Sequence, residues 1–209
     1  GTQVIYDDGG NPYPAAGVTR KIYESGFDLT IAAGGSVYHS ADNGGTYIVI
    51  KDPDDTSADL AGADMAVGSG LRLWLIRPYT YGVPPDNNHL KAYASNTFGA
   101  TWNPSVPIIT GSSSPIRSPQ VAVNGPTIVL VWKHADPSTL DKPQSMKCLI
   151  SQDDGANWLP VDTGISLTGT HEIADVALAN HQGRFSLVYS VVVDGSTPAG
   201  VYLTELKLQ

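Results

Sequence analysis

Short apolar runs separated by turn-forming residues recur along the chain. Three of them, Met65-Ala66-Val67, Val121-Ala122-Val123 and Val176-Ala177-Leu178, are alike and lie 56 and 55 residues apart. Apolar runs of this length bounded by Gly, Pro, Asn and Asp predict strands, and a fixed period predicts a repeat architecture. No stretch has the spacing of an amphipathic helix of useful length. The pattern therefore predicts an all-β repeat protein whose alanine-centred triplets form crowded inner strands.

A second repeated element is an octapeptide with serine, a short carboxylate and glycine at alternate positions. Its copies begin at residues 40, 95 and 151, which gives spacings of 55 and 56 residues. The carboxylate can accept hydrogen bonds from backbone N–H groups, and the glycine allows a positive φ. In the second copy Thr97 replaces the carboxylate, so we expect that turn to be held more weakly. The residues with this structural role are Ser40, Asp42, Gly44, Ser95, Gly99, Trp102, Ser151, Asp153, Gly155 and Trp158.

The octapeptide resembles S-x-D-x-G-x-T-W, the Asp-box of sialidases and other BNR-repeat β-propellers. The resemblance implies an all-β, Asp-box β-propeller whose boxes lie on the periphery, away from the ligand face, so Asp42 and Asp153 are expected to be structural. Each repeat is interpreted as a four-stranded blade, with the box between the third and outer strands. We predict a single domain over residues 1–209, with blade-like units at 9–52, 53–109, 110–165 and 166–209. Residues 2–8 are predicted to close the ring as the outer strand of the last blade; the alternative is a slice of a larger propeller.

Composition argues against some partners. The net charge is −8 with 12 basic residues and no basic cluster, which argues against nucleic acid. No run of about 18 apolar residues is present to span a membrane. The one cysteine, Cys148, cannot form an internal disulfide, and its place in an alternating strand predicts a buried, unreactive thiol.

Candidate ligand-binding residues lie on the loops that enter inner strands or join second strands to third strands, which share one face in this architecture. Arg117 and Glu172 hold equivalent positions ahead of two inner strands, so both are predicted near the mouth of the central channel. The alternative is that they only pair with each other. Arg77 and Lys133 are interpreted as equivalent residues at the ends of second strands. The adjoining candidates are His171, Tyr79, Tyr81 and His134.

No cofactor is predicted, and calcium is the one metal with any support. The run Asp52-Pro53-Asp54-Asp55, with Asp59 nearby, offers the oxygen ligands that Ca²⁺ prefers. It lacks the D-x-D-x-D-G spacing of a dedicated loop, so a solvated acidic loop is the expected structure.

The favoured function is a non-enzymatic recognition or attachment domain that binds carbohydrate or a glycoprotein surface. We expect it on a secreted, cell-surface or virion protein, outside the cell, in receptor binding. The sialidase resemblance implies an active centre with three arginines, a Tyr–Glu pair and an acid Asp, whereas the chain has only five arginines and three glutamates. One alternative is a sialidase-like glycoside hydrolase that uses Arg117 and Glu172. The other is a structural or assembly module that contacts copies of itself as a homo-oligomer.

Overall fold

The computed structural model describes residues 21–33, 36–61, 64–79, 89–110, 112, 115–135, 142–195 and 197–206. The first sheet contains β1 (Lys21–Ser25), β2 (Asp28–Ala33), β3 (Ser36–Ser40) and β4 (Ile48–Val49). A small hairpin sheet of β5 (Lys51–Asp52) and β6 (Asp55–Asp59) follows it. The second sheet contains β7 (Asp64–Val67), β8 (Leu73–Tyr79), β9 (His89–Ser95) and β10 (Val106–Ile109), with the short 3₁₀ helix η1 (Ser69–Leu71) in its first turn.

The third sheet contains β11 (Ile116–Asn124), β12 (Thr127–Ala135), β13 (Pro143–Ser151) and β14 (Leu159–Val161). The fourth sheet contains β15 (His171–His181), β16 (Arg184–Val193) and β17 (Thr197–Glu205). In each of these four sheets the strands are antiparallel and lie in chain order, as the predicted units require.

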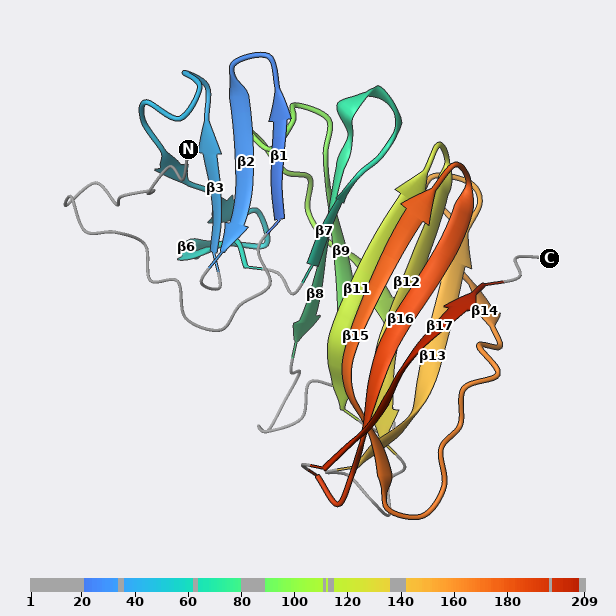
Figure 1. Cartoon of the computed structure of the whole chain (residues 1–209). Coiled ribbons are helices and arrows are strands. Elements are labelled where there is room, and N and C mark those ends of the chain that lie inside the picture. The colour runs from blue at the N-terminus through green and yellow to red at the C-terminus, as the bar shows by residue number, and fades with distance from the viewer. Residues whose placement is uncertain are drawn as a thin grey trace.

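The four larger sheets stand side by side in chain order, and their first strands, β1, β7, β11 and β15, are successive neighbours (Figure 1). The predicted all-β organisation into small repeated sheets is therefore confirmed. Among the described residues no sheet closes a ring, and the predicted closing strand, residues 2–8, lies outside them. In the same part of the chain no helix is long and apolar enough to cross a membrane.

Apolar side chains fill the space between successive sheets. Because strand residues alternate between the two faces of a sheet, the first and second triplets each contact two neighbouring sheets. Met65 packs toward the first sheet and Ala66 toward the third. In the third sheet, Val121 packs toward the second sheet and Ala122 toward the fourth. Removing these faces from water is the main favourable contribution to the stability of the fold.

The fourth sheet leaves one apolar face uncovered. Val201 and Leu203 are 73% and 72% exposed, whereas Cys148 and Ile150, at the same positions in the third sheet, are 3% and 4% exposed. The equivalence follows from the register, because β13 and β17 pair with the second strands of their sheets in the same way. The difference in burial therefore comes from the neighbouring sheet and not from the strand itself.

The three octapeptide turns share one backbone path and differ in their acceptor. In the third sheet, Asn157 N donates to Asp153 Oδ1 at 2.8 Å. In the second sheet a hydroxyl takes the place of the carboxylate, and Thr101 N donates to Thr97 Oγ1 at 2.8 Å. The side chain and the N–H of Asn157 lower the pKa of Asp153. The two central residues of every turn have positive φ: Asn43-Gly44, Phe98-Gly99 and Asp154-Gly155.

The glycines of the second and third turns pack against the preceding sheet. Gly155 lies against the indole of Trp74 in the second sheet, and Gly99 lies against the side chain of Thr30 in the first. A Cβ atom at either glycine would collide with that neighbour. The turns therefore fix the spacing between sheets as well as the link between their third and fourth strands.

Replacing Ile150 by alanine should destabilise the protein by about 2–5 kcal/mol, because it leaves a cavity between two sheets. The same change at the equivalent exposed residue, Leu203, should stay within about 0.5 kcal/mol. Urea denaturation of both variants measures the difference. Equal losses would mean that the free face of the fourth sheet is covered in solution.

Asp153→Ala should lower the denaturation midpoint more than Thr97→Ala, because a carboxylate acceptor forms the stronger hydrogen bonds. The folded state lowers the pKa of Asp153, so its contribution is present above the unfolded value of about 3.9 and is lost as the pH falls below it. The gap between the two variants should therefore shrink below about pH 4. A gap that is absent at neutral pH would contradict the structural role of the carboxylate.

Candidate functional site

The start of β15 carries a β-bulge that brings two carboxylates onto one face. Glu172 pairs with Val192 and Asp175 pairs with Ser190, so Ala174 is an extra residue without a partner on β16. Residues three apart on a regular strand point to opposite faces, but one inserted residue turns them to the same face. Glu172 and Asp175 are then two ladder positions apart, which corresponds to about 7 Å along the strand.

The Asp175 carboxylate borders a shallow hollow in the fourth sheet. Asp175 is exposed, and its Oδ1 accepts the N–H of Val176 at 2.8 Å. The hollow has a volume of 130 Å³, and Ala177, Val188 and Val201 contribute apolar surface to it. Apolar surface with a polar group at its edge suits the C–H face and the hydroxyls of a sugar ring.

Glu172 lies deeper than Asp175 and has a cation beside it. Its side chain is 13% exposed, and its Oε1 lies 3.7 Å from Nζ of Lys142, which directly precedes β13. Asp194 and Gly195, which turn the chain between β16 and β17, both have positive φ. A Cβ at Gly195 would lie 3.9 Å from Oε1 of Glu172, so this turn lies beside the carboxylate and covers one side of it.

Lys133 of the third sheet reaches the same bulge from the other side of β15. Its Nζ donates to the carbonyl oxygen of Ala174 at 2.8 Å. Burial lowers the pKa of Lys133, the positive charge of Arg117 lowers it further, and the negative charge of Asp175 opposes both. The bulge therefore has a half-buried ammonium behind it and two carboxylates in front.

Arg117 and Glu172 occupy equivalent places in the register. Each immediately precedes a bulge in the first strand of its sheet, and in β11 the bulge includes Ser118, whose φ is +47°. Arg117 pairs with Lys133 across the ladder, so both side chains lie on the face toward the fourth sheet. Lys142 is a cation beside the Glu172 carboxylate.

The two histidines predicted here are not brought together. His171 is the first residue of β15, and its exposed ring places Nδ1 3.2 Å from the carbonyl oxygen of Thr168. His134 lies on the face of β12 that also carries Trp132 and packs toward the second sheet. It therefore points away from the bulge.

Arg77 and Tyr79 belong to a separate cluster on the second sheet. Arg77 Nη1 lies 2.5 Å from Oδ2 of Asp52, whose side chain is 4% exposed. Nζ of Lys91 lies 4.6 Å from the ring centroid of Tyr79. The ion pair ties the β5–β6 hairpin to β8. Tyr81 lies outside the described residues, so a ligand-binding role for it stays a prediction.

The predicted equivalence of Arg77 and Lys133 is wrong by one residue. Counted from the serine of the octapeptide, Arg77 is the partner of Lys91, whereas the same place on β12 is taken by Trp132, the partner of Lys147. The cause is the first hairpin of the second sheet, where η1 makes the turn one residue longer than in the third sheet.

The acidic run between the first and second sheets is held by protein donors. Asp54 accepts hydrogen bonds from Ser105 N and Lys91 Nζ, both at 2.9 Å. Burial disfavours its charge, but these contacts outweigh burial and lower the pKa of Asp54 to about 2. Side-chain donors also contact the other carboxylates of the run, those of Asp52, Asp55 and Asp59. In the described ranges, no group of three or more His, Cys, Asp and Glu residues converges to hold a metal ion.

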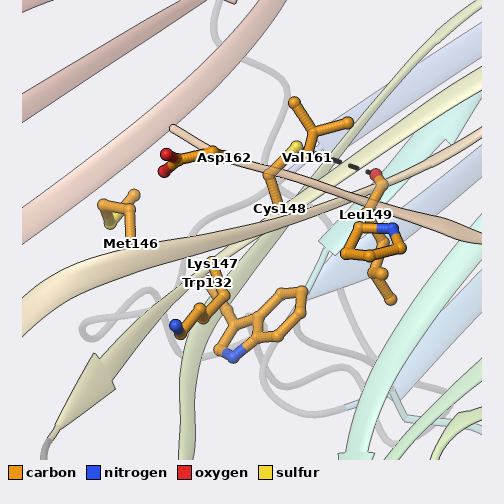
Figure 2. A pocket seen from close by; sticks show the side chains of 8 residues that line it. Trp132, Met146, Lys147, Cys148, Leu149, Val161 and Asp162 are labelled. Carbon is orange, nitrogen blue, oxygen red and sulfur yellow. Dashed lines mark hydrogen bonds between the residues drawn. The ribbon is translucent and has the colours of Figure 1, made fainter. Parts of the chain in front are cut away.

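A larger cavity, of 410 Å³, lies along β13 and β14 of the third sheet (Figure 2). Its lining is mainly apolar and includes Met146, Cys148 and Val161, with Asp162 as its one carboxylate. Burial raises the pKa of Cys148 to about 12, so the thiol is protonated at neutral pH and a poor nucleophile. The hollow beside Asp175 is the better candidate site, because a second carboxylate, that of Glu172, lies on the same face of β15.

Sequence reasoning missed Asp175, although a signal for it was present. Asp175 directly precedes the third triplet, just as Asp64 precedes the first. Asp64 is 3% exposed, and its Oδ2 accepts the N–H of Val121 from the third sheet at 2.7 Å. The bulge that turns Glu172 to the side of Asp175 has no comparable signature in the sequence.

No protein-family model matches the sequence, and no curated protein sequence is similar to it. Solved structures do share its fold. A Penicillium chrysogenum α-L-arabinanase complexed with arabinobiose aligns with a TM-score of 0.60 at 19% identity, over 89% of this chain and 61% of that chain. A Fusarium graminearum α-L-arabinofuranosidase aligns with a TM-score of 0.60 at 16% identity, over 97% of this chain and 66% of that chain. This chain thus spans less than two thirds of the length of either enzyme.

A GH43 β-1,3-galactosidase in complex with galactodeoxynojirimycin has a TM-score of 0.56 at 10% identity, over 99% of this chain and 94% of that chain. These similarities place the fold among the β-propellers of glycoside hydrolases and do not single out the Asp-box sialidase-like family. The prediction of a non-enzymatic recognition domain is overturned, because the structures that share the fold are named as glycoside hydrolases. The comparisons favour the alternative that the sequence left open, a glycoside hydrolase.

Proposed function

We propose that this chain is a glycoside hydrolase in which Glu172 and Asp175 form the carboxyl pair. The observation that carries the proposal is the bulge in β15, which places both carboxylates on one face of the sheet, where Asp175 lines a hollow with apolar surface. Glycosidic bonds are usually cleaved by two such groups: one protonates the leaving oxygen, while the other activates water or attacks the sugar. The fold shared with the arabinanase, the arabinofuranosidase and the β-1,3-galactosidase supports the reaction class.

The same geometry suggests how a sugar would bind. The ring would rest its C–H face on Val188 and Val201, with Asp175 at its edge and Glu172 further along the strand. Asp64, at the equivalent place in the second sheet, is unsuited to this task because the third sheet covers it and it already accepts the Val121 N–H. Polysaccharides are extracellular substrates, so an extracellular location is part of the proposal.

Glu172→Gln and Asp175→Asn should each lower kcat/KM by about 10²-fold or more, the usual scale for loss of a general acid or base. The wild-type chain and both variants are assayed against aryl α-L-arabinofuranosides, aryl β-galactosides and debranched arabinan. Glu205→Gln is the matched control, since Glu205 lies in β17 and its carboxylate is 3.8 Å from Arg184, away from the hollow. Full activity in both carboxylate variants would exclude this pair.

The spacing of the pair also fixes a stereochemical expectation. The two residues lie about 7 Å apart along the strand, a backbone spacing that matches the carboxyl separation of inverting enzymes better than the roughly 5 Å of retaining ones. Proton NMR of the first-formed sugar should therefore show the inverted anomer. A retained anomer would count against the proposed pair. If the wild-type chain hydrolyses no substrate in the panel, the proposed activity is wrong.

Closure of the ring by residues 2–8 is a further part of the proposal, supported by β17, which pairs with β16 alone among the described strands. Replacing residues 1–8 by a Gly/Ser segment of equal length should lower Tm by at least about 4 °C, equivalent to roughly 1–2 kcal/mol for a chain of this size. Circular dichroism melts measure the change, and removal of residues 207–209 is the control. An unchanged Tm would reject the closing strand.

A further inference from the structure

The ammonium group of Lys133 joins two sheets at the bulge. Lys133 lies on β12 of the third sheet, on the face toward the fourth sheet, and is half-buried. Its Nζ donates to the carbonyl oxygen of Ala174 on β15 at 2.8 Å. This contact links a charged side chain of one sheet to the backbone of the next.

Ala174 is the residue on which the direction of the two carboxylates depends. It has no partner on β16, and only this insertion puts Glu172 and Asp175 on the same face. Ala174 is exposed and falls outside the regular ladder, so its carbonyl oxygen is open to a donor from outside the sheet. Lys133 supplies that donor from behind the strand.

Burial and the charge of Asp175 act in opposite directions on the ammonium group of Lys133. Desolvation of the half-buried ammonium is unfavourable, and the positive charge of Arg117 adds to the cost, whereas the negative charge of Asp175 offsets part of it. A charged donor to a backbone carbonyl forms a stronger hydrogen bond than a neutral one. An apolar side chain of similar length would fill the same space and leave the Ala174 oxygen without this donor.

We propose that Lys133 is a positioning residue: it holds the Ala174 carbonyl and thereby keeps Glu172 and Asp175 aligned on one face of the fourth sheet. The inference rests on the proposed function for its effect on the reaction. Its structural part, control of the bulge from the neighbouring sheet, stands on the hydrogen bond and the register alone.

The test compares Lys133→Met, Lys133→Arg and the control Lys147→Met, an exposed lysine on β13 of the same sheet. Lys133→Met should lower kcat by up to about 10²-fold, the cost of a misplaced catalytic group, with KM changed by less than about threefold. Lys133→Arg keeps a charged donor and should recover most of kcat. Amide hydrogen exchange should quicken at residues 173–176 in Lys133→Met and stay at the wild-type rate in Lys147→Met.

Faster exchange with an unchanged kcat would overturn the positioning role, and so would an unchanged exchange rate at residues 173–176. If Lys133→Met does not fold, Lys133→Gln, which keeps an amide donor, takes its place in the same comparison. A wild-type chain without glycosidase activity would refute the proposed function, and the exchange data would then decide the structural part alone: quickened exchange confined to β15 upholds it, and no change rejects it.

Discussion

The packing of one sheet on the next is the constraint on which the rest of this structure depends. Each sheet has two apolar faces, and a residue such as Ala66 or Ala122 is buried only because a neighbouring sheet lies against it. The small alanine side chain lets neighbouring inner strands approach each other. The glycines of the octapeptide turns make the same allowance after the third strands, where Gly155 lies against Trp74. Both repeated elements of the sequence therefore carry small residues at points where neighbouring sheets come into close contact.

Much of the fold could be predicted because these two elements recur at nearly constant spacing. The triplets predicted the first strands of three sheets, and the octapeptides predicted the turns that follow the third strands. Prediction failed where the number of residues in a hairpin changes. One additional residue at η1 shifts β8 relative to β12, so Arg77 corresponds to Trp132 and not to Lys133. Spacing in the sequence counts residues, whereas register depends on the turn that each hairpin adopts.

The candidate site could be predicted only in part, for a related reason. The equivalence of Arg117 and Glu172 was visible in the sequence, because both precede a triplet by the same number of residues. Strict alternation, however, puts Glu172 and Asp175 on opposite faces, and only the bulge at Ala174 reverses this. The functional prediction failed because it looked for a complete sialidase set, with its arginines and its Tyr–Glu pair. The proposed site needs only two carboxylates on one strand. Strict alternation predicts opposite faces for Glu172 and Asp175, so the pair could not be recognised from the sequence.

Asp64 and Asp175 illustrate how one repeat position can hold a structural carboxylate in one sheet and, on the proposed function, a reactive carboxylate in another. Both directly precede a triplet, yet Asp64 is covered by the third sheet and accepts a hydrogen bond from the Val121 N–H. Asp175 faces away from the third sheet, on the face where Val201 and Leu203 are exposed, so the same position is open to a ligand. Packing therefore decides whether this position is covered or open, and the bulge places a second carboxylate, Glu172, on the open face. On the proposed function, the reactive centre lies on the one face of the fourth sheet that no described sheet covers. Lys133 lies in the interface between the third and fourth sheets, and its hydrogen bond to Ala174 holds the two carboxylates in place.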